Sequence, residues 1–149
     1  MVVRIHRGQC LETPNEAWQP TRTQSRRVNW LAVMAGGALG AALRHAMGGL
    51  WVAAAFPWAT FVVNVTGSFA LGFLARYFGP PHGSHPAFLF LTVGLCGGYT
   101  TFSTFTLDTF AIVESRAFVR ALTYVSASVV ASYAALVVGY QLARSLRPI

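Results

Sequence analysis

Apolar residues along the chain gather into four long segments separated by short links. The segments cover approximately residues 30–56, 58–78, 86–112 and 118–142. Each is long enough to cross a hydrocarbon core, which requires roughly 20 helical residues. Proline and glycine mark several links, as in Phe56-Pro57 and in residues 79–83. The pattern therefore predicts an all-α membrane protein with four transmembrane helices.

The composition agrees with this prediction. Hydrophobic residues make up 54% of the 149 residues, and charged residues only 10%. A soluble domain would carry about a quarter charged residues. Four spans leave no room for a second domain, so a hydrolase or nucleotide-binding fold is excluded and we expect no enzymatic activity.

Residues 1–29 differ from the rest of the chain. They contain two acids, two prolines and no apolar run, so we expect a flexible basic tail before a four-span domain at residues 30–149. The tail lacks the apolar stretch of a signal peptide. A nucleic-acid role is disfavoured because Trp18 is its sole aromatic residue. Its basic residues are Arg4, Arg7, Arg22, Arg26 and Arg27.

All eleven basic residues are arginines, and their placement bears on topology. With four spans, the tail, the second loop and the C-terminus share one face, and Arg116 and Arg120 lie on the other. The positive-inside rule then predicts cytoplasmic termini. Without the tail arginines the bias is nearly neutral, so the sequence leaves open whether the chain inserts in both orientations.

The third apolar segment is interrupted near its middle. Gly94, Gly97 and Gly98 are followed by Thr100, Thr101, Ser103 and Thr104. Glycine weakens a helix, and small hydroxyl side chains compete for backbone hydrogen bonds. Freed backbone groups at membrane depth are tolerated only where protein or a polar cavity satisfies them. We therefore predict a broken third helix and an ion or substrate site beside it.

Two stripes of neutral polar side chains accompany this break. Asn64 can make an interhelical hydrogen bond or donate its NH₂ group to an anion. It is spaced four residues from both Thr60 and Ser68, so the three share one helical face. The fourth segment repeats the spacing with Tyr124, Ser128 and Ser132. Together the stripes predict a narrow route lined by hydrogen-bond donors.

Charged residues inside the segments are few. Arg44 either anchors the first helix at the interface or draws anions into a vestibule, and both roles are compatible. Asp108 and Glu114 fall near the end of the third segment, and the other segments have no carboxylate. Proton-coupled exporters and cation paths favour acidic groups within the bundle. Hydroxyls, an amide and an arginine suit an anion better.

The sequence resembles the Fluc (CrcB-type) fluoride ion channels, small four-span bacterial membrane proteins. The resemblance covers about residues 36–142, and its most specific part is Gly97-Gly98-Tyr99-Thr100-Thr101-Phe102-Ser103-Thr104-Phe105. Supporting motifs are residues 40–45 in the first segment and 63–69 in the second. Departures are His45, where the family often has tyrosine, and Ala59, where glycine is common.

The resemblance implies an antiparallel homodimer in the bacterial inner membrane, enclosing two fluoride pores. Phe102 and Phe105 would offer their ring edges to fluoride, because the edge of an aromatic ring is positive. A structural Na⁺ at the dimer interface would be held by the backbone carbonyls of Gly97 and Thr100. The fluoride path implied for this chain comprises Asn64, Phe102, Ser103, Thr104, Phe105, Tyr124, Ser128 and Ser132.

The function expected from the resemblance is a fluoride-selective channel that lowers cytoplasmic fluoride by passive efflux. Besides fluoride, the expected partners are a second copy of the chain and membrane lipid, and no nucleic acid. One alternative is a small proton-coupled multidrug exporter, which requires a carboxylate in the first span; residues 30–56 have none. Another is a non-transporting scaffold, which leaves the polar stripes and the residue 97–105 motif unexplained.

Overall fold

The computed structural model describes residues 20–51, 56–78 and 85–146, and every element of secondary structure in these ranges is a helix. In chain order the elements are α1 (Pro20–Gly48), η2 (Gly49–Trp51), α2 (Trp58–Phe78), α3 (Pro86–Leu89), η4 (Phe90–Cys96), α4 (Gly97–Tyr99), α5 (Phe102–Glu114) and α6 (Phe118–Leu146). The all-α prediction is confirmed for these residues.

Helix α1 differs from the expected first segment at both ends. It begins at Pro20, so residues 20–29, expected as part of the tail, are helical; residues 1–19 lie outside the described residues. Proline suits the first turn of a helix, because its missing N–H would have no partner there. The helix ends at Gly48 rather than near residue 56, and Gly49 opens the short η2. Two adjacent glycines favour this ending.

Three helical stretches are long and apolar enough to cross a membrane among the described residues: Trp58–Phe78, Pro86–Glu114 and Phe118–Leu146. Helix α1 is long but less apolar, because Arg44 and His45 interrupt its second half and its first ten residues are mostly polar. The chain is therefore a multi-pass helical protein. The count of four spans stays a prediction.

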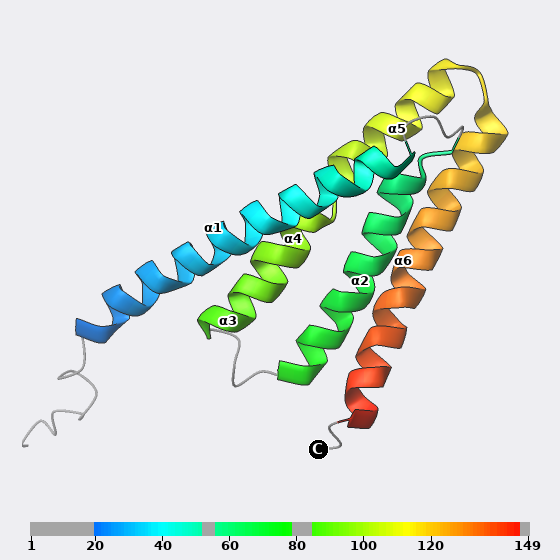
Figure 1. Cartoon of the computed structure of the whole chain (residues 1–149). Helices are drawn as coiled ribbons and strands as arrows, with labels where there is room; N and C mark the ends of the chain where they lie inside the picture. Colours follow the sequence, from blue (N-terminus) through cyan, green and yellow to red (C-terminus); the bar gives the residue numbers. More distant parts are fainter. Residues whose placement is uncertain (1–19, 52–55, 79–84, 147–149) are drawn as a thin grey trace, which may run out of the picture.

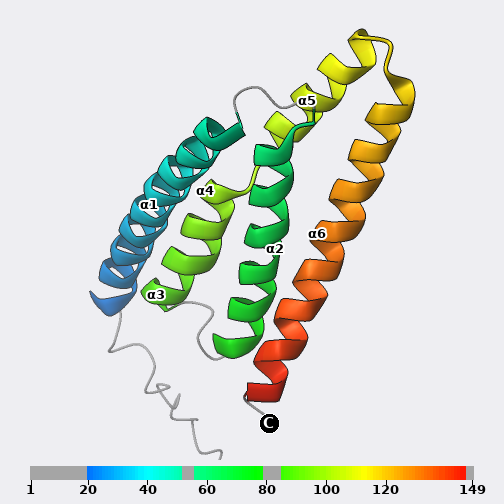
Figure 2. The same cartoon turned by 45° about the vertical axis from the view of Figure 1, so that its right-hand side comes forward.

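The helices form an open bundle (Figures 1 and 2). Helices α2 and α6 run side by side, and α1 crosses over the stretch from α3 to α4. Helix α5 then turns away beyond the start of α2 and returns into α6. The starts of α1 and α3 and the ends of α2 and α6 lie at one end of the bundle.

Glycines allow α2 and α6 to approach closely. A Cβ atom added to Gly72 would collide with the carbonyl oxygen of Leu136. A Cβ atom added to Gly139 would collide with the carbonyl oxygen of Phe69 in the same way. Small residues at helix interfaces let backbones meet, which is the main source of packing energy between helices in lipid.

The contact of α1 with the third span also depends on small residues. A Cβ on Gly36 would collide with the Phe90 carbonyl oxygen, and one on Gly98 would meet the backbone of Gly37 at 2.5–3.1 Å. The facing stretch η4 is a seven-residue π-helix. A Cβ on Gly40, one turn after Gly36, would likewise collide with the Leu95 carbonyl oxygen, so both glycines serve helix packing.

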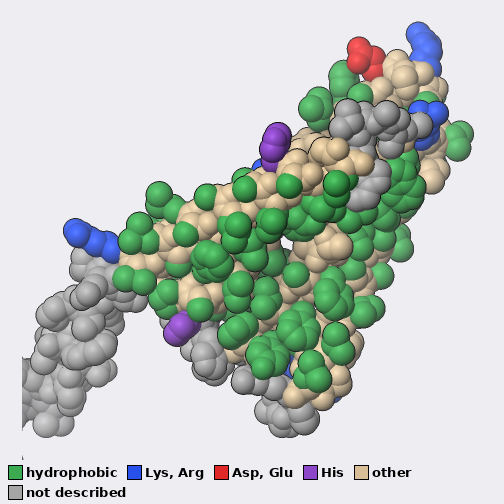
Figure 3. Space-filling view, viewed as in Figure 1, with side chains coloured by type: hydrophobic (Ala, Val, Ile, Leu, Met, Phe, Trp, Pro, Cys, Tyr) green, Lys and Arg blue, Asp and Glu red, His purple; other side chains and the backbone are tan. Residues whose placement is uncertain are grey.

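Few large side chains are buried within one chain. Val63 and Tyr124 are almost completely buried, and Tyr124 packs in a small cluster with Ile112 and Ala121. Most large apolar side chains of α5 and α6 point outward (Figure 3). An apolar exterior is what a lipid-facing or subunit-facing surface requires.

Candidate functional site

The third span breaks at two residues. Helix α4 ends at Tyr99, and Thr100 and Thr101 both adopt extended backbone conformations, with φ/ψ of −73°/157° and −150°/121°. The Thr101 hydroxyl then caps α5 by accepting a hydrogen bond from the backbone N–H of Thr104 at 3.2 Å. The break therefore lies where the glycine and threonine pattern predicts it.

Asn64 on α2 pairs with the backbone at this break. Its Nδ2 donates to the Thr101 carbonyl oxygen at 3.1 Å, and its Oδ1 accepts from the Thr101 N–H at 2.8 Å. The carboxamide thus bonds to both backbone groups of Thr101, at the point where the helix is interrupted. One N–H of the Asn64 NH₂ group serves Thr101, and an amide has a second N–H for another acceptor.

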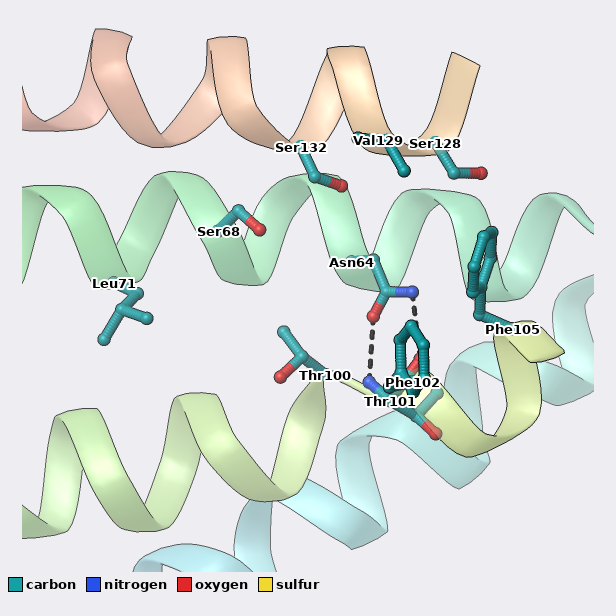
Figure 4. Close-up of a pocket in the computed structure, with 10 residues that line it drawn as sticks. All are labelled: Asn64, Ser68, Leu71, Thr100, Thr101, Phe102, Phe105, Ser128, Val129 and Ser132. Atoms are coloured by element: carbon teal, nitrogen blue, oxygen red, sulfur yellow. Dashed lines mark hydrogen bonds between the residues drawn. The ribbon is translucent and has the colours of Figure 1, made fainter. Parts of the chain in front are cut away.

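A cavity of about 290 Å³ lies between the break, α2, α5 and α6 (Figure 4). Five of the eight residues expected along the fluoride path line it: Asn64, Phe102, Phe105, Ser128 and Ser132. The rest of its wall consists of Ser68, Leu71, Thr100, Thr101 and Val129. The wall carries amide and hydroxyl donors and apolar groups, and no charged side chain among the described residues.

The two polar stripes meet across this cavity. Ser68 and Asn64 project from α2, and Ser128 and Ser132 project from α6 (Figure 4). Ser128 is only 5% exposed, and its hydroxyl has no hydrogen-bond partner among the described residues. A buried hydroxyl without a partner is uncommon and requires an explanation, which a transient ligand would supply.

Phe102 and Phe105 stand on the first turn of α5, beside the cavity. Their ring centroids are 5.8 Å apart with planes at 40°. Phe105 also packs against Tyr124, at 5.3 Å between centroids. Phe102, in contrast, is 77% exposed. One ring is therefore fixed by its own chain, and the other has most of its surface free for a further contact.

Three expected path residues do not line the cavity. Ser103 and Thr104 are exposed on the first turn of α5, where both hydroxyls bond to the Thr101 hydroxyl, at 3.2 and 3.1 Å. Tyr124 is completely buried behind Phe105. In this chain these groups support the break and Phe105, and their contact with fluoride stays a prediction.

Asp108 is the residue that the sequence reasoning missed. It accepts hydrogen bonds from the Thr60 hydroxyl at 2.6 Å and from the Tyr124 hydroxyl at 3.3 Å. A carboxylate therefore lies inside the bundle, against both polar stripes, rather than merely near a helix end. Its spacing of three from Phe105, which is itself three from Phe102, places it on their face of α5. That spacing could have identified it.

Arg44 reaches the break from α1. Its Nη1 donates to the Thr100 carbonyl oxygen at 3.4 Å, and Thr100 lines the cavity. The side chain is half-buried. This position puts a positive charge beside the cavity wall, and both roles expected of Arg44, interface anchor and anion vestibule, stay predictions.

The backbone on the α4 side of the break carries the carbonyls expected to bind sodium. In a continuous helix the Thr101 N–H would bond to the Gly97 carbonyl oxygen, but here it bonds to Asn64. Gly97 is exposed, and a Cβ added to it would meet only Thr92 O, at 3.9 Å. The described residues contain no cluster of three His, Cys, Asp or Glu side chains that could hold a metal.

Taken together, the apolar helices and the polar cavity at a helix break define a multi-pass membrane protein with an intramembrane polar site. Residues 31–140 match the family model described as "CrcB-like protein, Camphor Resistance (CrcB)". The chain belongs to this family.

Three relatives of this chain share the same name. A protein from Nitrobacter winogradskyi is 48% identical over 118 residues, which is 76% of this chain and 94% of the relative. A protein from Rhizobium meliloti is 46% identical over 121 residues, 78% and 96% of the two chains. One from Rhodospirillum centenum is 48% identical over 121 residues, which is 77% of this chain and 94% of the relative. Each is named "Fluoride-specific ion channel FluC".

Proposed function

We propose that this protein is a fluoride-specific ion channel that lowers cytoplasmic fluoride by passive efflux. The observation that carries the proposal is the cavity at the helix break, where Asn64, Ser128 and Ser132 present neutral donors beside Phe102 and Phe105. The family and the names of its relatives support the same function.

The chemistry of the cavity suits a small, strongly hydrated anion. Hydroxyl and amide donors replace the water that fluoride must shed, and the ring edges add weak positive potential. Arg44 donates a hydrogen bond to the Thr100 carbonyl oxygen and so places a positive charge beside the break. A site with neutral walls binds an anion weakly enough to release it, which conduction requires.

Passive efflux needs no energy-coupling residue. Hydrogen fluoride crosses membranes as the neutral acid and dissociates inside, which traps the anion. The membrane potential favours exit of an anion by about 2.3 kcal/mol per 100 mV. A pore in the inner membrane that admits fluoride is therefore sufficient to lower its concentration in the cell.

The proposed assembly is an antiparallel homodimer of four-span subunits, with α1 as the fourth span. The exposed ring of Phe102 and the apolar exteriors of α5 and α6 support a second copy against this face. Engineered cysteines at both bundle ends, labelled from one side of sealed vesicles, test the orientation. Labelling of one end alone would contradict the antiparallel arrangement.

The break also fits a structural Na⁺ held by the carbonyls of Gly97 and Thr100. The Gly97 carbonyl lacks its helical donor because the Thr101 N–H bonds to Asn64. When bound, Na⁺ would supply a positive charge that compensates the partial negative charge of these carbonyl oxygens. The Thr100 carbonyl oxygen has two lone pairs, so one would face Na⁺ while the other accepts the hydrogen bond from Arg44.

The deciding experiment is ion efflux from liposomes containing the purified protein. Vesicles are loaded with potassium fluoride or potassium chloride, and valinomycin is added so that potassium balances the charge. We expect rapid fluoride release and little chloride release, without any imposed proton gradient. Equal release of both anions would contradict a fluoride-specific channel, and release only with a proton gradient would indicate a coupled exporter.

A further inference from the structure

A second cavity, remote from the fluoride path, lies at the bundle end where α1 begins. Its volume is about 360 Å³, within the usual range of ligand sites. It shares no residue with the cavity at the break. Four residues of α1 and two of the third span line it: Arg26, Asn29, Trp30, Val33, Leu89 and Val93.

The wall of this cavity is polar toward the start of α1. Arg26 is exposed, so its guanidinium is free to reach an anion. The Oδ1 atom of Asn29 is buried and has no hydrogen-bond partner among the described residues. Buried amide oxygens normally accept a hydrogen bond, so this one is open to a donor that the described residues do not supply.

The remainder of the wall is apolar. Val33 continues α1 deeper into the bundle, and Leu89 and Val93 face it from the third span. Trp30 stands between the polar and apolar parts and is 68% exposed. Tryptophan concentrates at the level of lipid headgroups, because its ring is apolar and its N–H is polar.

The surrounding charge is positive. Arg26 and Arg27 stand near the start of α1, Arg76 in the last turn of α2 and Arg144 in the last turn of α6. These helix termini lie at the same end of the bundle, and Figure 3 shows basic side chains at the start of α1. Arginines at one face of a membrane attract anionic lipid, and Arg26 is the arginine that lines this cavity.

We propose that this cavity binds the headgroup of an anionic glycerophospholipid that carries hydroxyl groups. The phosphate pairs with the Arg26 guanidinium, a headgroup hydroxyl donates to Asn29, and an acyl chain follows Val33, Leu89 and Val93. Phosphatidylglycerol has this combination of groups. Phosphatidylcholine has the phosphate but no hydrogen-bond donor in its headgroup, so the unpartnered Asn29 oxygen favours phosphatidylglycerol.

The test is lipid binding to the detergent-solubilised full chain, followed by native mass spectrometry. The probes are phosphatidylglycerol and phosphatidylcholine with the same acyl chains, and glycerol phosphate without them. Arg26→Gln is compared with Arg27→Gln, which removes the same charge from an exposed residue that does not line the cavity. Asn29→Leu removes the amide while keeping similar bulk. Fluoride efflux of each variant confirms that it is folded.

The parent should bind phosphatidylglycerol more tightly than phosphatidylcholine. Arg26→Gln should weaken phosphatidylglycerol binding by roughly tenfold or more, the loss of one charge-assisted hydrogen bond. Arg27→Gln should change it little, and Asn29→Leu should reduce the preference between the two lipids.

Three outcomes would overturn the proposal. One is equal weakening by the Arg26 and Arg27 variants, which would indicate a diffuse surface charge. Another is displacement of phosphatidylglycerol by an equal concentration of glycerol phosphate, which would indicate a site for free phosphate. The third is disulfide formation between two copies carrying Val93→Cys, which would show that a second subunit covers the cavity.

Discussion

Asn64 holds the backbone of Thr101 through two hydrogen bonds, from Nδ2 to the carbonyl oxygen at 3.1 Å and from the backbone N–H to Oδ1 at 2.8 Å. This pair joins α2 to the break in the third span. It gives Asn64 a structural role in addition to its place in the cavity wall.

Replacing Asn64 with aspartate should impair both stability and fluoride flux. A carboxylate still accepts from the Thr101 N–H, but it cannot donate to the Thr101 carbonyl and adds a charge that repels an anion. We expect a loss of about 1–3 kcal/mol in the free energy of unfolding. Unfolding in detergent and fluoride efflux from liposomes measure the two effects.

Ser68→Ala is the matched control for Asn64, because Ser68 lines the same cavity one turn along α2. It should leave the break intact. If Asn64→Asp unfolded no more readily than Ser68→Ala, the hydrogen bonds to Thr101 would not stabilise the break.

Replacing Phe102 or Phe105 with isoleucine should strongly reduce fluoride flux. Isoleucine keeps apolar bulk but lacks the positive ring edge. Phe105 packs against Tyr124, so Phe105→Ile should also lower stability, by about 1 kcal/mol. Phe102 is mostly exposed in one chain, and its variant should be destabilised less. Efflux and unfolding are measured on the same preparations.

Phe118→Ile serves as the aromatic control, since Phe118 is exposed at the start of α6 and does not line the cavity. It should conduct like the parent. Parental fluoride efflux in all three variants would show that the ion path lies elsewhere.

Removing the hydroxyl of Tyr124 should destabilise the bundle modestly. Tyr124→Phe keeps the ring against Phe105 and loses the 3.3 Å hydrogen bond to Asp108. We expect a loss of about 0.5–1.5 kcal/mol in the free energy of unfolding. Thr60→Val should cost more, because the bond from Thr60 to Asp108 is shorter, at 2.6 Å.

A double-mutant cycle with Asp108→Asn tests whether these hydroxyls act through the carboxylate. Residues in one hydrogen-bond network typically couple by about 0.5–3 kcal/mol. Additive effects of Tyr124→Phe and Asp108→Asn would mean that the two side chains do not interact in solution.

Adding a methyl group at the contact of α2 and α6 should destabilise the fold. Gly72→Ala places a Cβ against the Leu136 carbonyl oxygen, and backbone atoms can move aside only if the helices separate. Overpacking of this kind costs about 1–3 kcal/mol. Gly37→Ala is the control, because its Cβ would meet nothing within 4 Å. Equal free energies of unfolding for the Gly72→Ala and Gly37→Ala variants would argue against a close contact between α2 and α6.

The sequence by itself determined the helical class, the membrane character and a break within the glycine- and threonine-rich stretch of the third segment. These are properties of local stretches: apolar length, glycine content and hydroxyl side chains act within a few residues of one another. The stripes through Asn64 and Ser128 were also predictable, because residues four apart share a helical face.

Only the tertiary structure decided which groups meet across helices. The pairing of Asn64 with Thr101, the reach of Arg44 to Thr100 and the bonds from Thr60 and Tyr124 to Asp108 join residues far apart in sequence. They depend on how each helix is rotated and shifted against its neighbours. Glycine contacts between backbones set those rotations, and the sequence does not show which backbone each glycine meets.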